Sequence, residues 1–232
     1  MSATLHSRAL GALTGLALGD ALGMPTQNLP RELVRERYGS VLTDFHPGPP
    51  DNEVSAGMAA ASVTDDTDQA LILGRLMVAG HGDVDQQQFA DELLVWEEMM
   101  RAAGSHDLLG PSTIRALTQV AAGADPETTG RWGDTNGAAM RVTPLGIAMP
   151  SDPLERLVSL VHRTGRVTHN THIAVAGAAA VAAAVSAALE GADLAEATDL
   201  AIEAAHLGAK HGHFAGGADV SARIAWALDV VR

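Results

Sequence analysis

The sequence has no cysteine among its 232 residues. This absence excludes a disulfide framework, a thiolate metal site and a cysteine nucleophile, and it is typical of a reducing compartment, so we expect a cytoplasmic protein. Aromatic residues are scarce, at 3% of the chain, which leaves little material for stacking nucleic-acid bases. The 15 lysines and arginines are outnumbered by 28 aspartates and glutamates, which gives a formal charge of −13. Because a phosphate backbone is bound by a basic surface, we predict that nucleic acid is not a main partner.

The N-terminal residues lack a basic stretch followed by a leucine-rich core, and therefore predict no secretory signal. The longest apolar run, residues 173–189, is close to the lower length limit for a membrane-spanning helix, roughly 17 residues. Most of this run is alanine, which contributes little transfer free energy, and no aromatic belt or basic cluster flanks it. We therefore expect a buried helix of a soluble bundle and no membrane partner.

Apolar side chains recur at helical spacing along most of the chain, and no alternating strand pattern extends beyond a few residues. The pattern predicts an all-α fold in a single domain spanning residues 1–232. A long loop is expected over residues 39–62, which contain three prolines and scattered glycines. The predicted helices cover residues 7–24, 66–79, 85–102, 111–121, 136–148 with a kink at Pro144, 153–162, 170–189, 194–207 and 218–231.

The first predicted helix contains a stripe of glycines at positions 11, 15 and 19. Each glycine costs about 1 kcal/mol relative to alanine in a helix interior. We therefore expect another element to pack closely against this stripe and offset the cost.

An acidic stretch joins the long loop to the next helix, where Thr64, Asp65, Asp66, Thr67 and Asp68 are consecutive. One interpretation is helix capping, with Thr64 as the N-cap and the carboxylates at the positive end of the helix dipole. The other is a metal site, because adjacent aspartates exceed what one cap requires and hard oxygen ligands suit Mg²⁺, Mn²⁺ or Ca²⁺. Spacing alone favours capping and leaves metal binding open.

A second polar stretch, residues 131–141, reads Arg-Trp-Gly-Asp-Thr-Asn-Gly-Ala-Ala-Met-Arg. One interpretation is a turn followed by a capped helix. The other is a phosphate cradle, in which Gly137 permits close backbone approach, N–H groups at the helix start face an anion, and Arg141 adds positive charge.

A third polar stretch, Thr168-His169-Asn170-Thr171-His172, precedes the alanine-rich helix. Histidines in such positions are most often helix caps or ordinary surface residues. Taken alone, this stretch predicts no chemical role.

The order and rough spacing of these stretches resemble the ADP-ribosylglycohydrolase family. The motifs that carry the resemblance are Gly-Leu-Ala-Leu-Gly-Asp-Ala-Leu-Gly at residues 15–23, Thr-Asp-Asp-Thr at 64–67, Asn-Gly-Ala-Ala-Met-Arg at 136–141 and His-Asn at 169–170. The resemblance extends from the first predicted helix to about the last. It implies a compact orthogonal multi-helix bundle with a binuclear Mg²⁺ or Mn²⁺ site. The implied activity is hydrolysis of the glycosidic bond that links ADP-ribose to a protein side chain or a related conjugate.

The resemblance also implies roles for individual residues. Thr64, Asp65 and Asp66 would be metal ligands, and Asp65 or Asp66 would contribute the catalytic carboxylate. The residues expected to bind ADP-ribose are Gly133, Asn136, Gly137, Met140, Arg141 and His169.

Two positions depart from the family pattern. Gln27 stands where family members usually carry a glutamate, and an amide cannot act as a carboxylate base. The C-terminal Gly-Gly-Asp-Thr-Asp-Thr motif is absent, and Gly216-Gly217-Ala218-Asp219 is only a superficial echo of it. We therefore expect a C-terminally shortened form that holds at most one weakly bound ion. The alternatives are a catalytically impaired ADP-ribose-binding module or fragment, and a nucleosidase-like enzyme.

Overall fold

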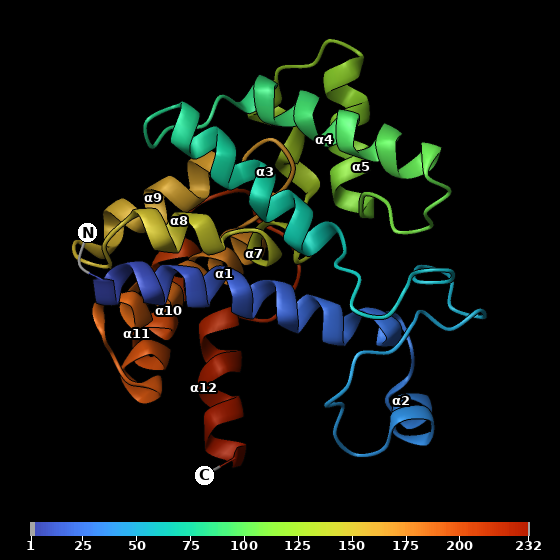
Figure 1. Ribbon diagram of the computed structural model, residues 1–232. Helices are drawn as coiled ribbons and strands as arrows, with labels where there is room; N and C mark the ends of the chain where they lie inside the picture. Colours follow the sequence, from blue (N-terminus) through green and yellow to red (C-terminus); the bar gives the residue numbers. More distant parts are fainter. Residues whose placement is uncertain (1–2, 232) are drawn as a thin grey trace.

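The computed structural model describes residues 3–231, which form helices, turns and loops. No β-strand occurs in these residues, and one isolated β-bridge pairs Thr171 with His213. The predicted all-α class is therefore confirmed (Figure 1).

The helices follow the predicted order, with bounds that shift by a few residues. The long loop is also confirmed, because no helix lies between Tyr38 and Asp65. The elements are α1 (Ala3–Gly23), the 3-10 helix η1 (Met24–Thr26), α2 (Arg31–Tyr38), α3 (Asp65–Ala79), α4 (Gln86–Ala102), α5 (Pro111–Ala121), α6 (Pro126–Thr129), the 3-10 helix η2 (Gly130–Trp132), α7 (Gly137–Met140), α8 (Thr143–Ala148), α9 (Leu154–Gly165), α10 (His172–Glu190), α11 (Leu194–Gly208) and α12 (Val220–Val231).

Prolines explain where the predicted helices differ from the observed ones. The single helix predicted over residues 136–148 is wrong, because the chain forms α7 and α8 with a break just before Pro144. Pro144 has no N–H with which to continue the hydrogen bonds of α7, and it instead occupies the first turn of α8, where a helix needs no such donor. A proline lies at the beginning of each unpredicted helix, because Pro30 is the N-cap residue of α2 and Pro126 is the first residue of α6.

The alanine-rich helix α10 lies at the centre of the bundle, in contact with α1, α7, α8, α9 and α11 (Figure 1). Its alanines at 178, 179, 182 and 183 are fully buried, and their small side chains let neighbouring helices approach closely. By length and composition alone α10 is apolar enough to cross a membrane, but 61% of that segment is buried inside the fold. Its burial is that of a core helix.

The glycine stripe of α1 does not pack against another helix. A Cβ atom added at Gly11, Gly15, Gly19 or Gly23 would meet nothing within 4 Å. The prediction of close packing is therefore wrong. Gly15, Gly19 and Gly23 instead line a cavity, whose width they increase by carrying no side chain.

Candidate functional site

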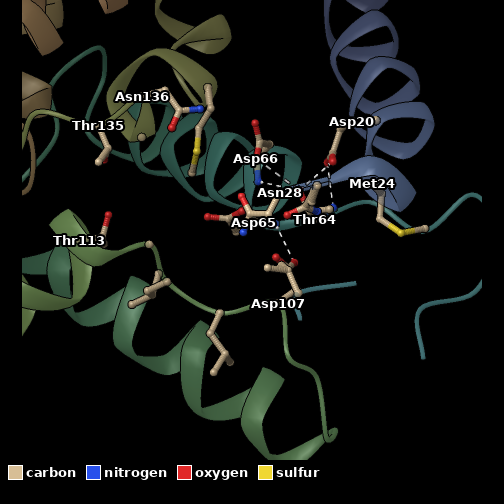
Figure 2. Close-up of a pocket in the computed structure, with 18 of the residues that line it drawn as sticks. Asp20, Met24, Asn28, Thr64, Asp65, Asp66, Asp107, Thr113, Thr135 and Asn136 are labelled. Atoms are coloured by element: carbon tan, nitrogen blue, oxygen red, sulfur yellow. Dashed lines mark hydrogen bonds between the residues drawn. The ribbon is translucent and has the colours of Figure 1, made fainter. Parts of the chain in front are cut away.

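A cavity of about 870 Å³ lies where α1 meets the beginning of α3 (Figure 2). Small-molecule sites in proteins commonly measure about 300 to 1,000 Å³, so this volume suits a ligand of nucleotide size. Its walls come from α1, η1, the loop before α5, the first turn of α3 and the turn before α7. The polar side chains that line it include Asp20, Gln27, Asn28, Thr64, Asp65, Asp66, His106, Asp107, Thr113, Thr135 and Asn136.

The acidic stretch forms the first turn of α3, with Thr64 as its N-cap. The Thr64 hydroxyl accepts a hydrogen bond from the Asp66 amide at 3.3 Å, so the capping interpretation is confirmed. Asp20 of α1 holds this turn from the side. Its carboxylate accepts from the Thr64 amide at 2.8 Å, the Thr64 hydroxyl at 2.7 Å and the Thr67 hydroxyl at 2.5 Å. One side chain of α1 thereby fixes the start of α3.

The three aspartates of the stretch point in different directions. Asp65 and Asp66 line the cavity. Asp68 does not, because its carboxylate accepts a 2.9 Å hydrogen bond from the Trp96 indole N–H of α4. Capping and cavity lining are therefore compatible in the same turn, with Asp65 and Asp66 left to face the space that Figure 2 shows.

Burial and like charges raise the pKa values of the carboxyl groups around this turn. Burial raises the pKa of Asp65, and the neighbouring Asp107 and Asp66 raise it further. Burial and the charge of Asp20 raise the pKa of Asp66. Burial also raises the pKa of Asp107 to about 7, although its carboxylate accepts a 3.1 Å hydrogen bond from the Asp65 amide. Such a cluster favours the uptake of protons or of a cation.

Thr64, Asp65 and Asp66 present oxygen donors of the type that Mg²⁺ and Mn²⁺ prefer. Across residues 3–231, however, no three histidine, aspartate or glutamate side chains converge closely enough to hold an ion. The described residues therefore offer part of a ligand set and do not assemble the binuclear site that the resemblance implied.

Asn136, Gly137 and Met140, which were predicted to bind ADP-ribose, line the cavity together with Thr135. Gly137 was predicted to allow a phosphate to approach the backbone, but the structure gives a different reason for a glycine at this position. A Cβ atom there would lie 2.5 Å from Cε1 of the His169 ring, so the backbone approach is to a histidine of the protein itself. The helix that follows, α7, has only four residues.

His169 and Gly133 lie behind this wall and do not line the cavity. The His169 side chain is 1% exposed, and its Nε2 atom is 2.9 Å from the Thr135 hydroxyl. Burial, with Arg141 and Arg115 nearby, lowers the pKa of His169 to about 3, so the imidazole is neutral. The Gly133 carbonyl accepts a 2.6 Å hydrogen bond from the Thr171 hydroxyl. Both residues hold the shape of the turn that Thr135 and Asn136 present.

The predicted role of Arg141 requires correction, because its side chain is 2% exposed and lies outside the cavity lining. Its guanidinium donates to the Thr168 hydroxyl and, at 2.8 Å, to Oε1 of Gln69, and it lies 4.9 Å from the Phe89 ring centroid. Burial lowers its pKa to about 10, so the group stays protonated at neutral pH. Arg141 is a buried structural cation and does not supply a direct ligand contact from the cavity wall.

Gln69 connects this buried cation to the acidic turn. Its amide oxygen accepts from Arg141, and its Nε2 donates to Oδ2 of Asp65 at 2.9 Å. The fully buried amide therefore fixes the orientation of the Asp65 carboxylate. Sequence reasoning assigned no role to Gln69, which lies one helical turn after Asp65, the spacing at which helical side chains meet.

Two further acidic residues of the site were not assigned from the sequence. Asp20 lies within the glycine-rich motif at residues 15–23, which was a signal for its position. Asp107 is a single acidic residue in the loop before α5, and no local pattern marks it. Gln27, noted as a departure from the family pattern, does line the cavity.

The C-terminal echo motif plays a purely local role. Asp219 precedes α12, and its Oδ1 accepts from the Ala222 amide at 2.9 Å and the Ser221 hydroxyl at 2.6 Å. These bonds lower the pKa of Asp219. Asp219 therefore caps α12 and is not among the residues that line the cavity.

Comparison with known proteins agrees with this arrangement of motifs. The sequence model of the ADP-ribosylglycohydrolase family matches residues 1–232. The chain belongs to the ADP-ribosylglycohydrolase family. It is 37% identical over 184 residues to the uncharacterized protein YegU of Escherichia coli K12, covering 79% of this chain and 54% of YegU.

Two relatives in this family carry enzyme names. The chain is 31% identical over 172 residues to the ADP-ribosyl-[dinitrogen reductase] glycohydrolase of Rhodospirillum rubrum, covering 72% of this chain and 53% of that protein. It is 32% identical over 195 residues to the ADP-ribosylarginine hydrolase Tri1 of Pseudomonas putida GB-1, covering 80% of this chain and 48% of Tri1. The chain therefore spans about half the length of the curated relatives it matches.

A solved structure confirms the fold of the family. A chain described as an ADP-ribosylglycohydrolase-related protein complex superimposes with a TM-score of 0.59 at 31% sequence identity, covering 83% of this chain and 59% of that one. The all-helical fold expected from the motifs is therefore the fold observed.

Proposed function

We propose that this member of the family binds ADP-ribose in the cavity and hydrolyses the glycosidic bond between ADP-ribose and a protein side chain. Family membership and the names of two relatives support this proposal. The observation that carries it is the first turn of α3, which brings Asp65 and Asp66 to a cavity of about 870 Å³. The proposed partner is therefore ADP-ribose or an ADP-ribosylated protein.

The proposed cofactor is Mg²⁺ or Mn²⁺, held by Thr64, Asp65 and Asp66. When bound, such an ion orients ribose hydroxyls and polarises a water molecule. A chain with a formal charge of −13 does not attract a dianionic diphosphate unless the local field is reversed, and a divalent ion supplies that reversal. The raised pKa values of the surrounding carboxyl groups support the same proposal.

The chain's own residues supply the positioning. Asp20 fixes Thr64, and Gln69 donates to Oδ2 of Asp65, so both side chains are held in place at the cavity. A hydrogen bond to Asp66 contributes to the raised pKa of Asp65, so Asp65 would accept a proton from a water molecule only in its ionised form. That water would attack the anomeric carbon as the bond to the side chain breaks, and the departing group would take up the proton that the carboxylate received. The wall formed by Thr135, Asn136 and Gly137 would hold the nucleotide on the opposite side of the cavity.

Turnover is tested with peptides that carry ADP-ribose on arginine or on serine. We expect release of ADP-ribose in Mg²⁺ or Mn²⁺, and a loss of about 100-fold or more in Asp65→Asn, because a positioned general base contributes about 10² to 10⁴ in rate. Asp199→Asn, an exposed carboxylate on α11, is the matched control and should keep full activity. Equal activity in Asp65→Asn and the control would contradict the proposed role of Asp65.

The metal role is tested by calorimetric titration of ADP-ribose into the chain. We expect binding in Mg²⁺ or Mn²⁺ and none in chelator. Equal affinity in chelator would remove the metal from the proposal and leave the cavity as the binding site.

A second candidate function is a catalytically silent ADP-ribose-binding module. The observation in its favour is that the described residues assemble only part of a metal ligand set. This alternative predicts protection of the fold by ADP-ribose without any turnover of the peptides. Released ADP-ribose would reject it.

A further inference from the structure

A series of buried hydrogen bonds runs behind the cavity wall from Arg141 to Thr135. The Arg141 guanidinium donates to the Thr168 hydroxyl, whose oxygen lies 2.8 Å from Nδ1 of His169. Nε2, the other ring nitrogen of His169, lies 2.9 Å from the Thr135 hydroxyl oxygen. The first three residues are at most 2% exposed, whereas Thr135 lines the cavity, as Figure 2 shows. We call these four side chains the Arg141-to-Thr135 network.

The direction of these hydrogen bonds can be followed from Arg141. A guanidinium has no acceptor, so the Thr168 oxygen accepts from it. The Thr168 hydroxyl also carries a proton of its own, and within residues 3–231 its only hydrogen-bond partner besides Arg141 is Nδ1 of His169. Because Thr168 is fully buried, a proton without an acceptor there would carry the full cost of an unsatisfied buried donor. Thr168 therefore donates to Nδ1.

The accepting Nδ1 atom fixes the tautomer of His169. The imidazole is neutral, because burial and the nearby Arg141 lower its pKa to about 3. A neutral imidazole carries one proton, and since Nδ1 accepts, that proton is on Nε2. Nε2 then donates to the Thr135 oxygen at 2.9 Å. The hydrogen bonds therefore point in one direction, from the buried cation towards the cavity wall.

The Thr135 hydroxyl ends the network as a donor. Its oxygen accepts from His169, and its own proton has no acceptor among residues 3–231. Because Thr135 lines the cavity, that proton is available to a ligand there. Hydrogen bonds in a series polarise one another, so the permanent cation at the buried end strengthens the donor at the cavity. An anionic oxygen is the acceptor that gains most from such a donor.

We propose that Thr135 is a specificity-determining residue whose hydroxyl donates a hydrogen bond to a phosphate oxygen of the ligand, and that His169 is the positioning residue that fixes this direction. The inference rests on the proposed binding of ADP-ribose, whose diphosphate supplies such oxygens. Arg141 then acts on the ligand through the network and without touching it. In a protein with a formal charge of −13, the network offers a polarised proton to a dianionic diphosphate without an exposed cation.

The tautomer of His169 tests the direction in the protein without any ligand. Nitrogen NMR of protein labelled with ¹⁵N-histidine, with the ring signals assigned through the backbone of residue 169, reports which ring nitrogen carries the proton. We expect the proton on Nε2 and no titration of this ring between about pH 5 and 8. A proton on Nδ1 would overturn the proposal, because Thr135 would then donate to Nε2 and have no proton for a ligand.

Variants of Thr135 test the donor towards the ligand by calorimetric titration of ADP-ribose in Mg²⁺. Thr135→Val should bind about tenfold or more weakly, because hydrogen bonds to charged groups contribute more than neutral ones. Thr135→Ser keeps the hydroxyl and should bind within about twofold of the wild type. The matched control is Thr118→Val, which removes the hydroxyl of an exposed threonine on α5 and should bind as the wild type does. Equal affinity in Thr135→Val and the wild type would overturn the proposal.

Phosphorus NMR of bound ADP-ribose identifies the acceptor. A diphosphate signal should shift in Thr135→Val and shift less in Thr135→Ser, and signals that are unchanged in Thr135→Val would overturn the assignment of a phosphate oxygen. Circular dichroism checks that each variant folds, and Thr135→Ala, which leaves room for a water molecule beside Nε2 of His169, replaces Thr135→Val if that variant does not. A wild type that does not bind ADP-ribose would refute the proposed function and the phosphate contact together, whereas the His169 tautomer would still decide the direction of the Thr135 hydrogen bond.

Discussion

Two polar clusters meet at Gln69, and they are built on opposite principles. Behind the cavity, Arg141 is enclosed by the Gln69 amide, the Thr168 hydroxyl and the Phe89 ring, so its buried charge is compensated within the protein. Facing the cavity, carboxylates crowd together and raise one another's pKa values. We call the residues around Arg141 (Gln69, Thr168 and Phe89) the rear cluster, and the carboxylates Asp65, Asp66 and Asp107 the front cluster. The polar groups of the rear cluster satisfy one another, whereas those of the front cluster repel one another when they are ionised.

The largest effect is expected from removing the rear cation. Arg141→Met leaves the Gln69 carbonyl without its buried donor, at a cost of about 1 to 3 kcal/mol, whereas the Thr168 hydroxyl keeps its 2.8 Å hydrogen bond with Nδ1 of His169. We expect a loss of up to about 3 kcal/mol in the free energy of unfolding, measured by urea denaturation. Arg163→Met is the control, because that side chain is 51% exposed and its ion pair with Asp83 is long, at 3.7 Å. A loss no larger than in the control would show that the rear cluster is not structural.

The next largest effect is expected at Gly137 in the cavity wall, where a methyl group should change stability in the opposite direction from one at Gly11 of α1. Gly137→Ala forces a methyl group against the His169 ring, and overpacking of this kind costs about 1 to 3 kcal/mol. Gly11→Ala is the matched control, because its methyl group meets nothing within 4 Å and it should stabilise the helix by about 0.5 to 1 kcal/mol. Thermal melts of both variants measure these opposite signs. The same sign in both would contradict the packing described for Gly137.

The crowding of carboxylates at the cavity should make the stability of the fold depend on pH. The pKa of Asp107 is about 7 in the folded chain, whereas an unfolded aspartate titrates near 3.9. Between these values the folded state binds the extra proton, so this group makes stability fall as pH rises from about 4 to about 7.

Asp107→Asn tests this sign in chelator. The amide oxygen still accepts from the Asp65 amide but carries no charge, so the variant should melt above the wild type at about pH 8 and together with it at about pH 5. Each kcal/mol corresponds to about 2 to 4 °C in the melting temperature of a chain this long. Asp199→Asn is the control and should show no pH-dependent difference. A wild type that melts higher than Asp107→Asn at about pH 8 would refute the crowding of carboxylates.

The smallest effect is expected at Gln27. Restoring a carboxylate with Gln27→Glu should change the rate of ADP-ribose release by less than about twofold, or under about 0.4 kcal/mol. One added carboxylate does not replace the rest of an incomplete ligand set. A tenfold gain in the rate would show that the amide, and not the missing ligands, limits the front cluster.

The sequence predicted the features that depend on neighbouring residues, but it did not predict the directions in which side chains point. It placed the cap at Thr64, the core helix at residues 170–189, where the structure has His172–Glu190, and the wall residues Asn136, Gly137 and Met140, because each depends on neighbours in the chain. It did not predict that Arg141 points inward, because that direction is set by Gln69, 72 positions away in the chain.

The other wrong or missing predictions also concern the three-dimensional surroundings of a residue, which neighbouring residues in the chain do not determine. Asp107 joins the site through a loop contact with Asp65, 42 positions away, which no local pattern records. The α1 glycines face open space, although their spacing is that of a packing stripe. The cytoplasmic location and the absence of nucleic-acid and membrane partners stay predictions.

Asp20 makes α1 part of two surfaces at once. Its carboxylate clamps the first turn of α3, while the same helix presents Leu10 and Leu18 to the outside. Any shift of α1 along its axis would drag Thr64 with it and change the distance between the oxygen donors. The positions of the oxygen atoms of Thr64 and Asp66 in the cavity are thus mechanically linked to whatever contacts the outer side of α1.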